Sequence, residues 1–247
     1  MITDDFLELI FPDRDVIDYK DKDIPYANNI IYHSLIVFGF PGSGKTTWVN
    51  SLAGHAIDKY KIDNVYASFS ESGDLNSIIN NFNPRLINLL YTDNATLAKY
   101  DDDTLHSYFM LRNLAHERYG ITNGYILSII ALHRYYSIPV EFRSVVDGII
   151  IRDVSLNPYD NSLLKKFIDD DDLFNVMKDI SVKRRDHREL MNFSIFIGKS
   201  MKGLVYMAPR RDFYFTEVGS HASLAVKRDE DIQHLLMYNH FSSRNKH

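Results

Sequence analysis

Short apolar runs separated by polar, helix-like stretches dominate this chain of 247 residues. Runs that are apolar on consecutive residues are typical of strands buried on both faces of a sheet, and helices between them supply the crossovers of a parallel sheet. The pattern therefore predicts an α/β fold with a mainly parallel sheet and helices on both faces. The expected strands are 30–38, 64–69, 85–91, 145–151, 193–197 and 212–218, and the expected helices are 45–56, 105–119 and 231–238.

Three segments depart from this alternation. Residues 1–28 form an N-terminal arm without a clear pattern, and residues 231–247 form a C-terminal helix and tail. The main domain is then expected to span residues 29–230. Within it, residues 121–144 are rich in Ile, Leu and Tyr but do not continue the alternation, so we expect them to form a helical insertion packed beside the sheet.

Composition narrows the class of protein. A hydrophobic fraction of 45% and a charged fraction of 25% are those of an ordinary globular domain with a real core. No apolar run approaches the roughly 20 residues of a membrane-spanning helix, so we expect no membrane contact, and the acidic N-terminus does not resemble a secretory signal. The absence of cysteine excludes disulfides, thiolate metal sites and Cys nucleophiles. A net charge of −5 excludes a uniformly basic protein that coats nucleic acid.

The most specific motif follows the first predicted strand. Residues 39–46, GFPGSGKT, match G-x-x-x-x-G-K-[ST], with an apolar strand before them and a helix after them. The glycines let backbone N–H groups wrap around phosphate oxygens, Lys45 can reach the β- and γ-phosphates, and the Thr46 hydroxyl can bind Mg²⁺. The motif therefore predicts a P-loop that binds ATP and Mg²⁺. Its nucleotide-binding residues are Gly39, Pro41, Gly42, Ser43, Gly44, Lys45, Thr46 and Thr47.

A P-loop ATPase also needs a carboxylate at the end of a neighbouring strand, and the candidate is Asp153. It follows the most apolar strand of the chain, in the run GIIIRD. In one alignment Asp153 is the acid associated with the metal. In the other, Arg152 takes that position and Asp153 is the second, catalytic acid. One carboxylate of the usual pair is missing in both alignments, and Glu71, after the second strand, is an alternative acid.

Two further segments carry candidate chemistry. The basic cluster KRRDHR at 183–188 precedes the strand at 193–197. It fits a solvated helix end, where cations suit the helix dipole, and it also fits an arginine finger offered to the γ-phosphate of a neighbouring subunit. Lys199, at the tip of that strand, fits a sensor of the γ-phosphate or a simple strand-to-helix turn. The ten histidines show no metal-binding spacing, and none is assigned to a metal.

In the order of these segments the chain resembles the genome-packaging ATPases of large DNA viruses of the poxvirus type and of turreted archaeal viruses. These belong to the FtsK–HerA group of P-loop motors, whose sheet is RecA-like. GFPGSGKT corresponds to the family's Walker A motif, GIIIRDVS to its apolar strand with an acidic end, and RDHRELMNFSIFIGKS to its Arg-His stretch, strand and sensor. MKGLVYMAPRRDFYFTEV resembles the next helix and the last core strand. Arg188 then falls on the family's arginine, and Lys199 on its sensor glutamine.

The resemblance implies an ATPase that moves double-stranded DNA and packages a viral genome into a capsid. Its partners would be DNA, capsid proteins and further copies of itself in a ring, commonly a hexamer, and it would work in the host-cell cytoplasm or on the virion. The catalytic residues would be Lys45, Asp153, Arg188 and Lys199, and the metal ligands Thr46 and Asp153. The residues also leave open a P-loop phosphotransferase, a kinase acting on a small substrate, and a nucleotide-binding regulatory ATPase.

Overall fold

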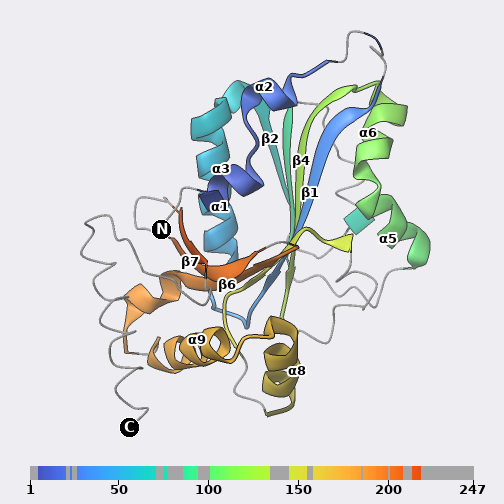
Figure 1. Cartoon of the computed structure of the whole chain (residues 1–247). Coiled ribbons are helices and arrows are strands. Elements are labelled where there is room, and N and C mark those ends of the chain that lie inside the picture. The colour runs from blue at the N-terminus through green and yellow to red at the C-terminus, as the bar shows by residue number, and fades with distance from the viewer. Residues whose placement is uncertain are drawn as a thin grey trace.

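A computed structural model describes much of the chain, and its centre is one sheet of eight strands in the order β2-β3-β4-β1-β5-β6-β7-β8 (Figure 1). The described residues are 5–20, 23, 27–70, 75–76, 86–93, 101–133, 145–154, 158–184, 186–199, 201–207 and 213–217. The strands are β1 Asn29–Phe38, β2 Val65–Ser70, β3 Ile87–Thr92, β4 Asn123–Leu132, β5 Gly148–Ile151, β6 Phe193–Gly198, β7 Lys202–Met207 and β8 Phe213–Glu217.

The first five strands along the chain run parallel to one another, and the last three form an antiparallel extension. β2, β3, β4, β1 and β5 pair in parallel, in that spatial order. β6 pairs antiparallel with β5, and β7 and β8 continue the antiparallel pattern. The predicted α/β class with a mainly parallel sheet is therefore confirmed.

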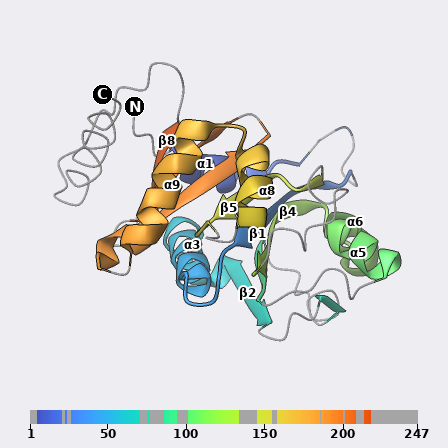
Figure 2. The same ribbon diagram turned by 90° about the horizontal axis from the view of Figure 1, so that it is seen from below.

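Helices cover both faces of the sheet (Figures 1 and 2). One face carries α1 Asp5–Ile10, α2 Arg14–Ile17 and α3 Lys45–Tyr60, and the other carries α5 Asp102–Phe109, α6 Leu111–Tyr119, α8 Pro158–Ile168 and α9 Asp171–Lys183. Short 3-10 helices lie at η1 Ile62–Asn64 and η4 Arg188–Asn192. None of the described helices is both long and apolar enough to cross a membrane.

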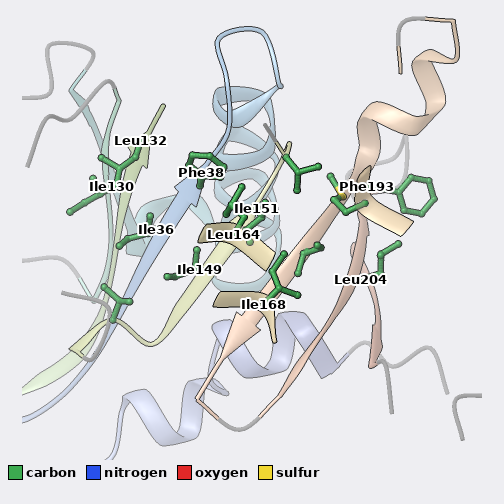
Figure 3. Packing of buried hydrophobic residues seen from close by; sticks show 14 of the residues in the cluster. Ile36, Phe38, Ile130, Leu132, Ile149, Ile151, Leu164, Ile168, Phe193 and Leu204 are labelled. Atoms are coloured by element: carbon green, nitrogen blue, oxygen red, sulfur yellow. The ribbon is translucent and has the colours of Figure 1, made fainter. Parts of the chain in front are cut away.

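The alternation of side chains along β1 explains why its apolar run is continuous. Ile36 and Phe38 pack into the core beneath α5, α6, α8 and α9 (Figure 3). Leu35 and Val37 point to the opposite face and pack with α3 and α1. Because successive side chains of a strand point to opposite faces, a strand buried on both faces needs apolar residues at every position.

The segment 121–144 corrects the sequence analysis. Its first half is not a helical insertion but β4, which pairs with both β1 and β3 in the middle of the sheet. All its side chains from Gly124 to Leu132 are buried, alternating between the two cores. Ser128 is the polar member of this run, and its hydroxyl lies 2.7 Å from that of Tyr32. Residues 125–132 are apolar at nearly every position, as in the other buried strands, but periodicity alone does not separate such a run from a buried helix.

Two other expectations also change. The single helix expected at 105–119 is two helices, α5 and α6, which meet at Met110. The helix that the resemblance implied after Ser200 is instead the strand β7, which pairs antiparallel with β6. The helix predicted at 231–238 lies outside the described residues.

The N-terminal arm contributes to the main core. Phe6 of α1 is fully buried, and its ring centroid lies 6.1 Å from that of Trp48 and 5.2 Å from that of Phe196. Further along the arm, Phe11 and Ile17 are also fully buried. Residues 5–20 therefore belong to the same packed unit as the P-loop helix α3.

Candidate active site

Four parallel strands end at the same edge of the sheet and bring polar residues together there. β1 leads into the P-loop, β3 is followed by Asp93, β4 by His133, and β5 by Arg152 and Asp153. In open α/β sheets, ligands bind outside the carboxyl ends of the strands, where the strand order reverses. Here the chain places β2, β3 and β4 on one side of β1 and β5 on the other. The edge that contains the P-loop is therefore the candidate site.

The P-loop has the backbone that a phosphate cradle needs. Gly42 and Gly44 both have φ of +80°, a conformation that favours glycine. A Cβ at Gly39 would lie 2.5 Å from the Ser43 hydroxyl, so only glycine allows the loop to close this tightly. The Ser43 hydroxyl is buried and has no hydrogen-bond partner among the described residues. Helix α3 begins at Lys45, so the unpaired N–H groups of its first turn face the loop and suit an anion.

Lys45 lies inside this loop. Its side chain is 5% exposed, and its ammonium donates to the carbonyl oxygens of Gly39 at 2.8 Å and Phe40 at 3.2 Å. The ammonium also lies 3.1 Å from Nδ1 of His133. Burial lowers the pKa of Lys45, the charge of Asp93 partly offsets this effect, and the charge of Arg152 adds to it. A cation with this little water around it attracts a phosphate strongly.

Thr46 contacts an acid that the sequence analysis did not choose. Its hydroxyl donates to Oδ2 of Asp93 at 3.1 Å. The backbone N–H of Asp93 donates to Ser70 O at 2.7 Å, which fixes the residue beside the end of β2. Tyr91 lies against the same pair: burial raises its pKa, the neighbouring Thr46 hydroxyl lowers it, and the charge of Asp93 raises it further. A hydroxyl beside a carboxylate is a set of hard oxygen ligands that suits Mg²⁺.

Neither Asp93 nor His133 is among the site residues predicted from the sequence, although a signal exists for one of them. Asp93 comes two residues after the strand predicted at 85–91, and asking which predicted strands end in an acid would have found it. His133 had no such signal, because the strand that it follows was read as a helix.

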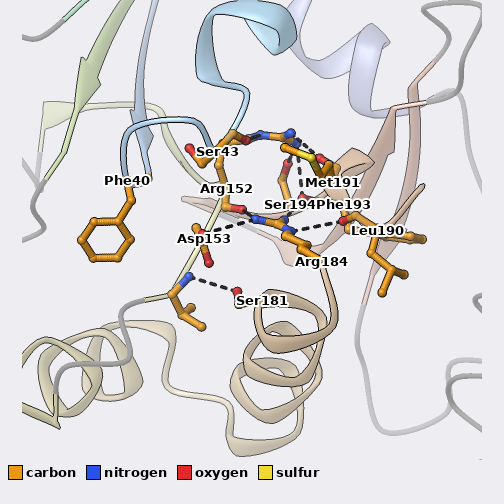
Figure 4. A network of polar contacts seen from close by, with 12 residues as sticks. Phe40, Ser43, Arg152, Asp153, Ser181, Arg184, Leu190, Met191, Phe193 and Ser194 are labelled. Atoms are coloured by element: carbon orange, nitrogen blue, oxygen red, sulfur yellow. Dashed lines mark hydrogen bonds and ion pairs between the residues drawn. The ribbon is translucent and has the colours of Figure 1, made fainter. Parts of the chain in front are cut away.

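Arg152 contacts the backbone of the P-loop, and Asp153 faces Arg184 (Figure 4). The Arg152 guanidinium is buried and points under the P-loop, where its Nε donates to Ser43 O at 3.3 Å. Asp153 lies against Arg184, with Oδ2 3.7 Å from Nη1. The carboxylate that contacts Thr46 is thus that of Asp93, while Asp153, the metal ligand predicted from the sequence, faces Arg184. Glu71, the alternative acid, lies outside the described residues.

In the basic cluster at 183–188, the described side chains of Lys183 and His187 are exposed, while that of Arg184 is buried. Arg184 is 8% exposed and donates to the backbone oxygens of Leu190, Phe193 and Arg152. Because its guanidinium is buried and bound to these carbonyl oxygens, Arg184 stabilises the interior of the domain and does not extend toward another subunit. Arg185 and the Arg188 side chain lie outside the described residues. The backbone of Arg188 begins η4, which leads into β6 at the candidate edge.

Lys199 lies at the wrong edge of the sheet for a phosphate sensor. β6 runs antiparallel to β5, so Gly198 pairs with Gly148 at the start of β5, while Ile195 pairs with Ile151 at its end. The Lys199 ammonium donates to Oδ1 of Asp147 at 2.7 Å. Because β6 runs antiparallel to β5, Lys199 lies at the opposite edge of the sheet from the P-loop.

No protein-family model and no curated protein matches this chain. Among solved structures, it is similar to the genome packaging NTPase of Sulfolobus turreted icosahedral virus 2 in complex with ATP-gammaS, at a TM-score of 0.45 and 10% identity over 70% of this chain and 96% of that one. The DNA-packaging ATPase of Sulfolobus turreted icosahedral virus gives a TM-score of 0.42 and 12% identity over 72% and 97%. A variant of RuvB from Thermotoga maritima gives 0.34 and 18% over 64% and 51%.

Proposed function

We propose that the protein is a Mg²⁺-dependent ATPase that acts as a motor on double-stranded DNA and packages a viral genome. The observation that carries the ATPase proposal is the pair of contacts at the P-loop, from Thr46 to Asp93 and from Lys45 to His133. These contacts join a complete phosphate-binding loop to an acid and a hydrogen-bonding side chain from two other strand ends.

Each residue has a distinct task in this proposal. The P-loop N–H groups and Lys45 bind the β- and γ-phosphates, after the ammonium leaves its present contacts with the loop carbonyls. Thr46 and Asp93 would hold Mg²⁺, which neutralises phosphate charge when it is bound. His133 contacts Lys45 and so lies where a side chain can hydrogen-bond to the terminal phosphate or to the attacking water.

Nucleotide binding can be tested with Lys45→Ala. A charge-assisted contact contributes about 1.5–3 kcal/mol, so the variant should bind ATP about 10- to 150-fold more weakly than the wild type. Titration with a fluorescent ATP analogue measures this loss, and thermal unfolding verifies that the variant is folded. Equal affinity in a folded variant would contradict the assignment of the loop.

Hydrolysis is proposed to depend on a neighbouring subunit through Arg188. η4 starts at this residue and lies at the edge of the sheet that holds the P-loop. An arginine finger of this type raises the rate of phosphoryl transfer about 10³- to 10⁵-fold. Arg188→Ala should bind ATP normally and hydrolyse it slowly, and mixing it with Lys45→Ala should restore activity, because some interfaces then pair an intact loop with an intact arginine. If mixing restores nothing and dilute monomer is fully active, the finger is refuted.

The motor proposal rests on the resemblance in the order of segments together with this site. It places the protein in a homo-oligomeric ring, a hexamer, with DNA and capsid proteins as partners in the host-cell cytoplasm or on the virion. Light scattering after size exclusion with ATP and Mg²⁺ tests the ring, and ATPase assays with and without linear double-stranded DNA test the coupling. A small species without DNA stimulation that phosphorylates a small molecule would instead identify a kinase.

A further inference from the structure

Two buried guanidinium groups lie directly behind the P-loop (Figure 4). Arg152 is 1% exposed and Arg184 is 8% exposed, and the carboxylate paired with them among the described residues is Asp153. Burial, followed by the like charge of Arg184, lowers the pKa of Arg152 to about 9, so this group is still charged at neutral pH. Burying a charge is costly unless its hydrogen bonds are satisfied, so the partners of these groups show what holds them there.

The first partner of Arg152 is a peptide of the P-loop. Its Nε donates to Ser43 O at 3.3 Å, and its Nη2 would lie 3.1 Å from a Cβ at Gly44. In a trans peptide the C=O and the next N–H point in opposite directions. Because the Ser43 carbonyl points at Arg152, the Gly44 N–H points away from that side chain. Donation to the carbonyl also polarises the peptide, which makes that N–H a better donor to an anion.

The remaining partners of Arg152 belong to the end of η4 and the start of β6. Its Nη1 donates to Ser194 Oγ at 2.7 Å and to Phe193 O at 3.2 Å, and its Nη2 donates to Met191 O. Arg184 holds the same junction through Phe193 O at 2.7 Å and through the carbonyl of Arg152. One rigid, planar group therefore touches the phosphate loop on one side and η4 on the other.

We propose that Arg152 is a positioning residue that fixes the Ser43–Gly44 peptide for phosphate binding and ties it to η4, the segment that begins with Arg188. The inference rests on the proposed function, since it takes the loop at 39–46 to bind ATP. When a phosphate orders the loop, Arg152 then also orders η4, the segment that would contact the next subunit.

The test compares Arg152→Lys with Ser194→Ala. Lysine keeps the charge but cannot span both the loop and η4 with a planar fork. The Ser194 variant removes a 2.7 Å hydrogen bond of the same guanidinium and leaves its contact with Ser43 intact. Both variants should lower the thermal midpoint. ATP and ADP affinity should fall about 10-fold or more in Arg152→Lys and stay within about twofold of the wild type in Ser194→Ala.

Equal nucleotide affinity in the two variants would overturn the positioning role, because Arg152 would then act on stability alone. If Arg152→Lys does not fold, Arg152→Gln replaces it in the same comparison. Amide hydrogen exchange at residues 188–192 tests the link to η4: ATP should slow it in the wild type, and saturating ATP should not slow it in the Arg152 variant. Equal slowing in both proteins, or none in the wild type, would overturn the link. If the wild type and Lys45→Ala bind ATP equally, the proposed function fails instead, so the two failures are distinguishable.

Discussion

Replacing Asp93 by Asn tests the central assignment of the site, because it removes one negative charge and preserves the shape of the side chain. Asp93 accepts a hydrogen bond from the Thr46 hydroxyl at 3.1 Å, and Asn can still accept it. The variant therefore changes charge at a fixed position. It should bind ATP without Mg²⁺ at least as tightly as the wild type, since Asp93 repels phosphate.

In Asp93→Asn, we expect the rate of ATP hydrolysis to fall and its dependence on Mg²⁺ concentration to change. A charge-assisted contact contributes about 1.5–3 kcal/mol, which is about 10- to 150-fold in rate. We expect kcat at saturating ATP to fall by about this factor, and the Mg²⁺ concentration for half-maximal activity to rise. The assay is steady-state phosphate release over a Mg²⁺ titration.

Asp153→Asn is the matched control, because it makes the same chemical change at the other candidate acid. Its carboxylate faces Arg184 at 3.7 Å and is 24% exposed. This variant should lower the thermal midpoint, because a partly buried ion pair is lost, and keep kcat within about threefold of the wild type. If Asp153→Asn abolishes hydrolysis while Asp93→Asn does not, the acid belongs to β5 and our assignment is refuted.

Three further predictions follow from the same geometry. His133→Ala should bind ATP but hydrolyse it about 10²-fold more slowly in single turnover, and an unchanged rate would remove His133 from the site. Lys199→Ala breaks a largely exposed ion pair with Asp147, so denaturant unfolding should change by less than about 1 kcal/mol with kcat unchanged, whereas a large loss of kcat would restore the sensor role. Burial raises the pKa of Tyr108 and Tyr125 above 10.0, so the folded chain keeps protons that the unfolded chain releases. The contribution of these two tyrosines to stability should therefore be constant below pH 10 and fall as the pH rises above it, and Tyr108→Phe should reduce this slope in urea unfolding measured against pH.

The P-loop and most strands could be predicted because their signals are local. GFPGSGKT needs particular residues at fixed spacing, and β1 and β5 are apolar on successive residues, as burial on both faces requires. The first helical residue, Lys45, was predicted correctly, since the glycine-rich turn ends there. In each of these cases the physical cause of the structure lies within a few residues of its position.

The order and direction of the strands could not be predicted in this way. Whether β6 runs parallel or antiparallel to β5 depends on the path of the chain through α8, α9 and η4, and no residue of β6 itself encodes it. Lys199 therefore lies at the edge of the sheet opposite to the P-loop, which no local signal in the sequence indicates. The acid has a local signal, since Asp93 follows the strand predicted at 85–91, whereas His133 follows β4, where no strand is predicted from the sequence.

The sheet also explains why position 152 needs a cation while position 93 carries the acid. Because β6 is antiparallel to β5, the carboxyl end of β5 lies beside η4, and the residue at 152 is surrounded by the carbonyl oxygens of Ser43, Met191 and Phe193. An acid there would be buried among acceptors, while Asp93 lies beside a hydroxyl donor and near the Lys45 ammonium. Arg152→Asp, which restores an acidic pair in the sequence, should therefore cost about 3–5 kcal/mol in stability and give no gain in hydrolysis. Urea unfolding and phosphate release measure both outcomes, and a stable, faster enzyme would show that the end of β5 does face the metal.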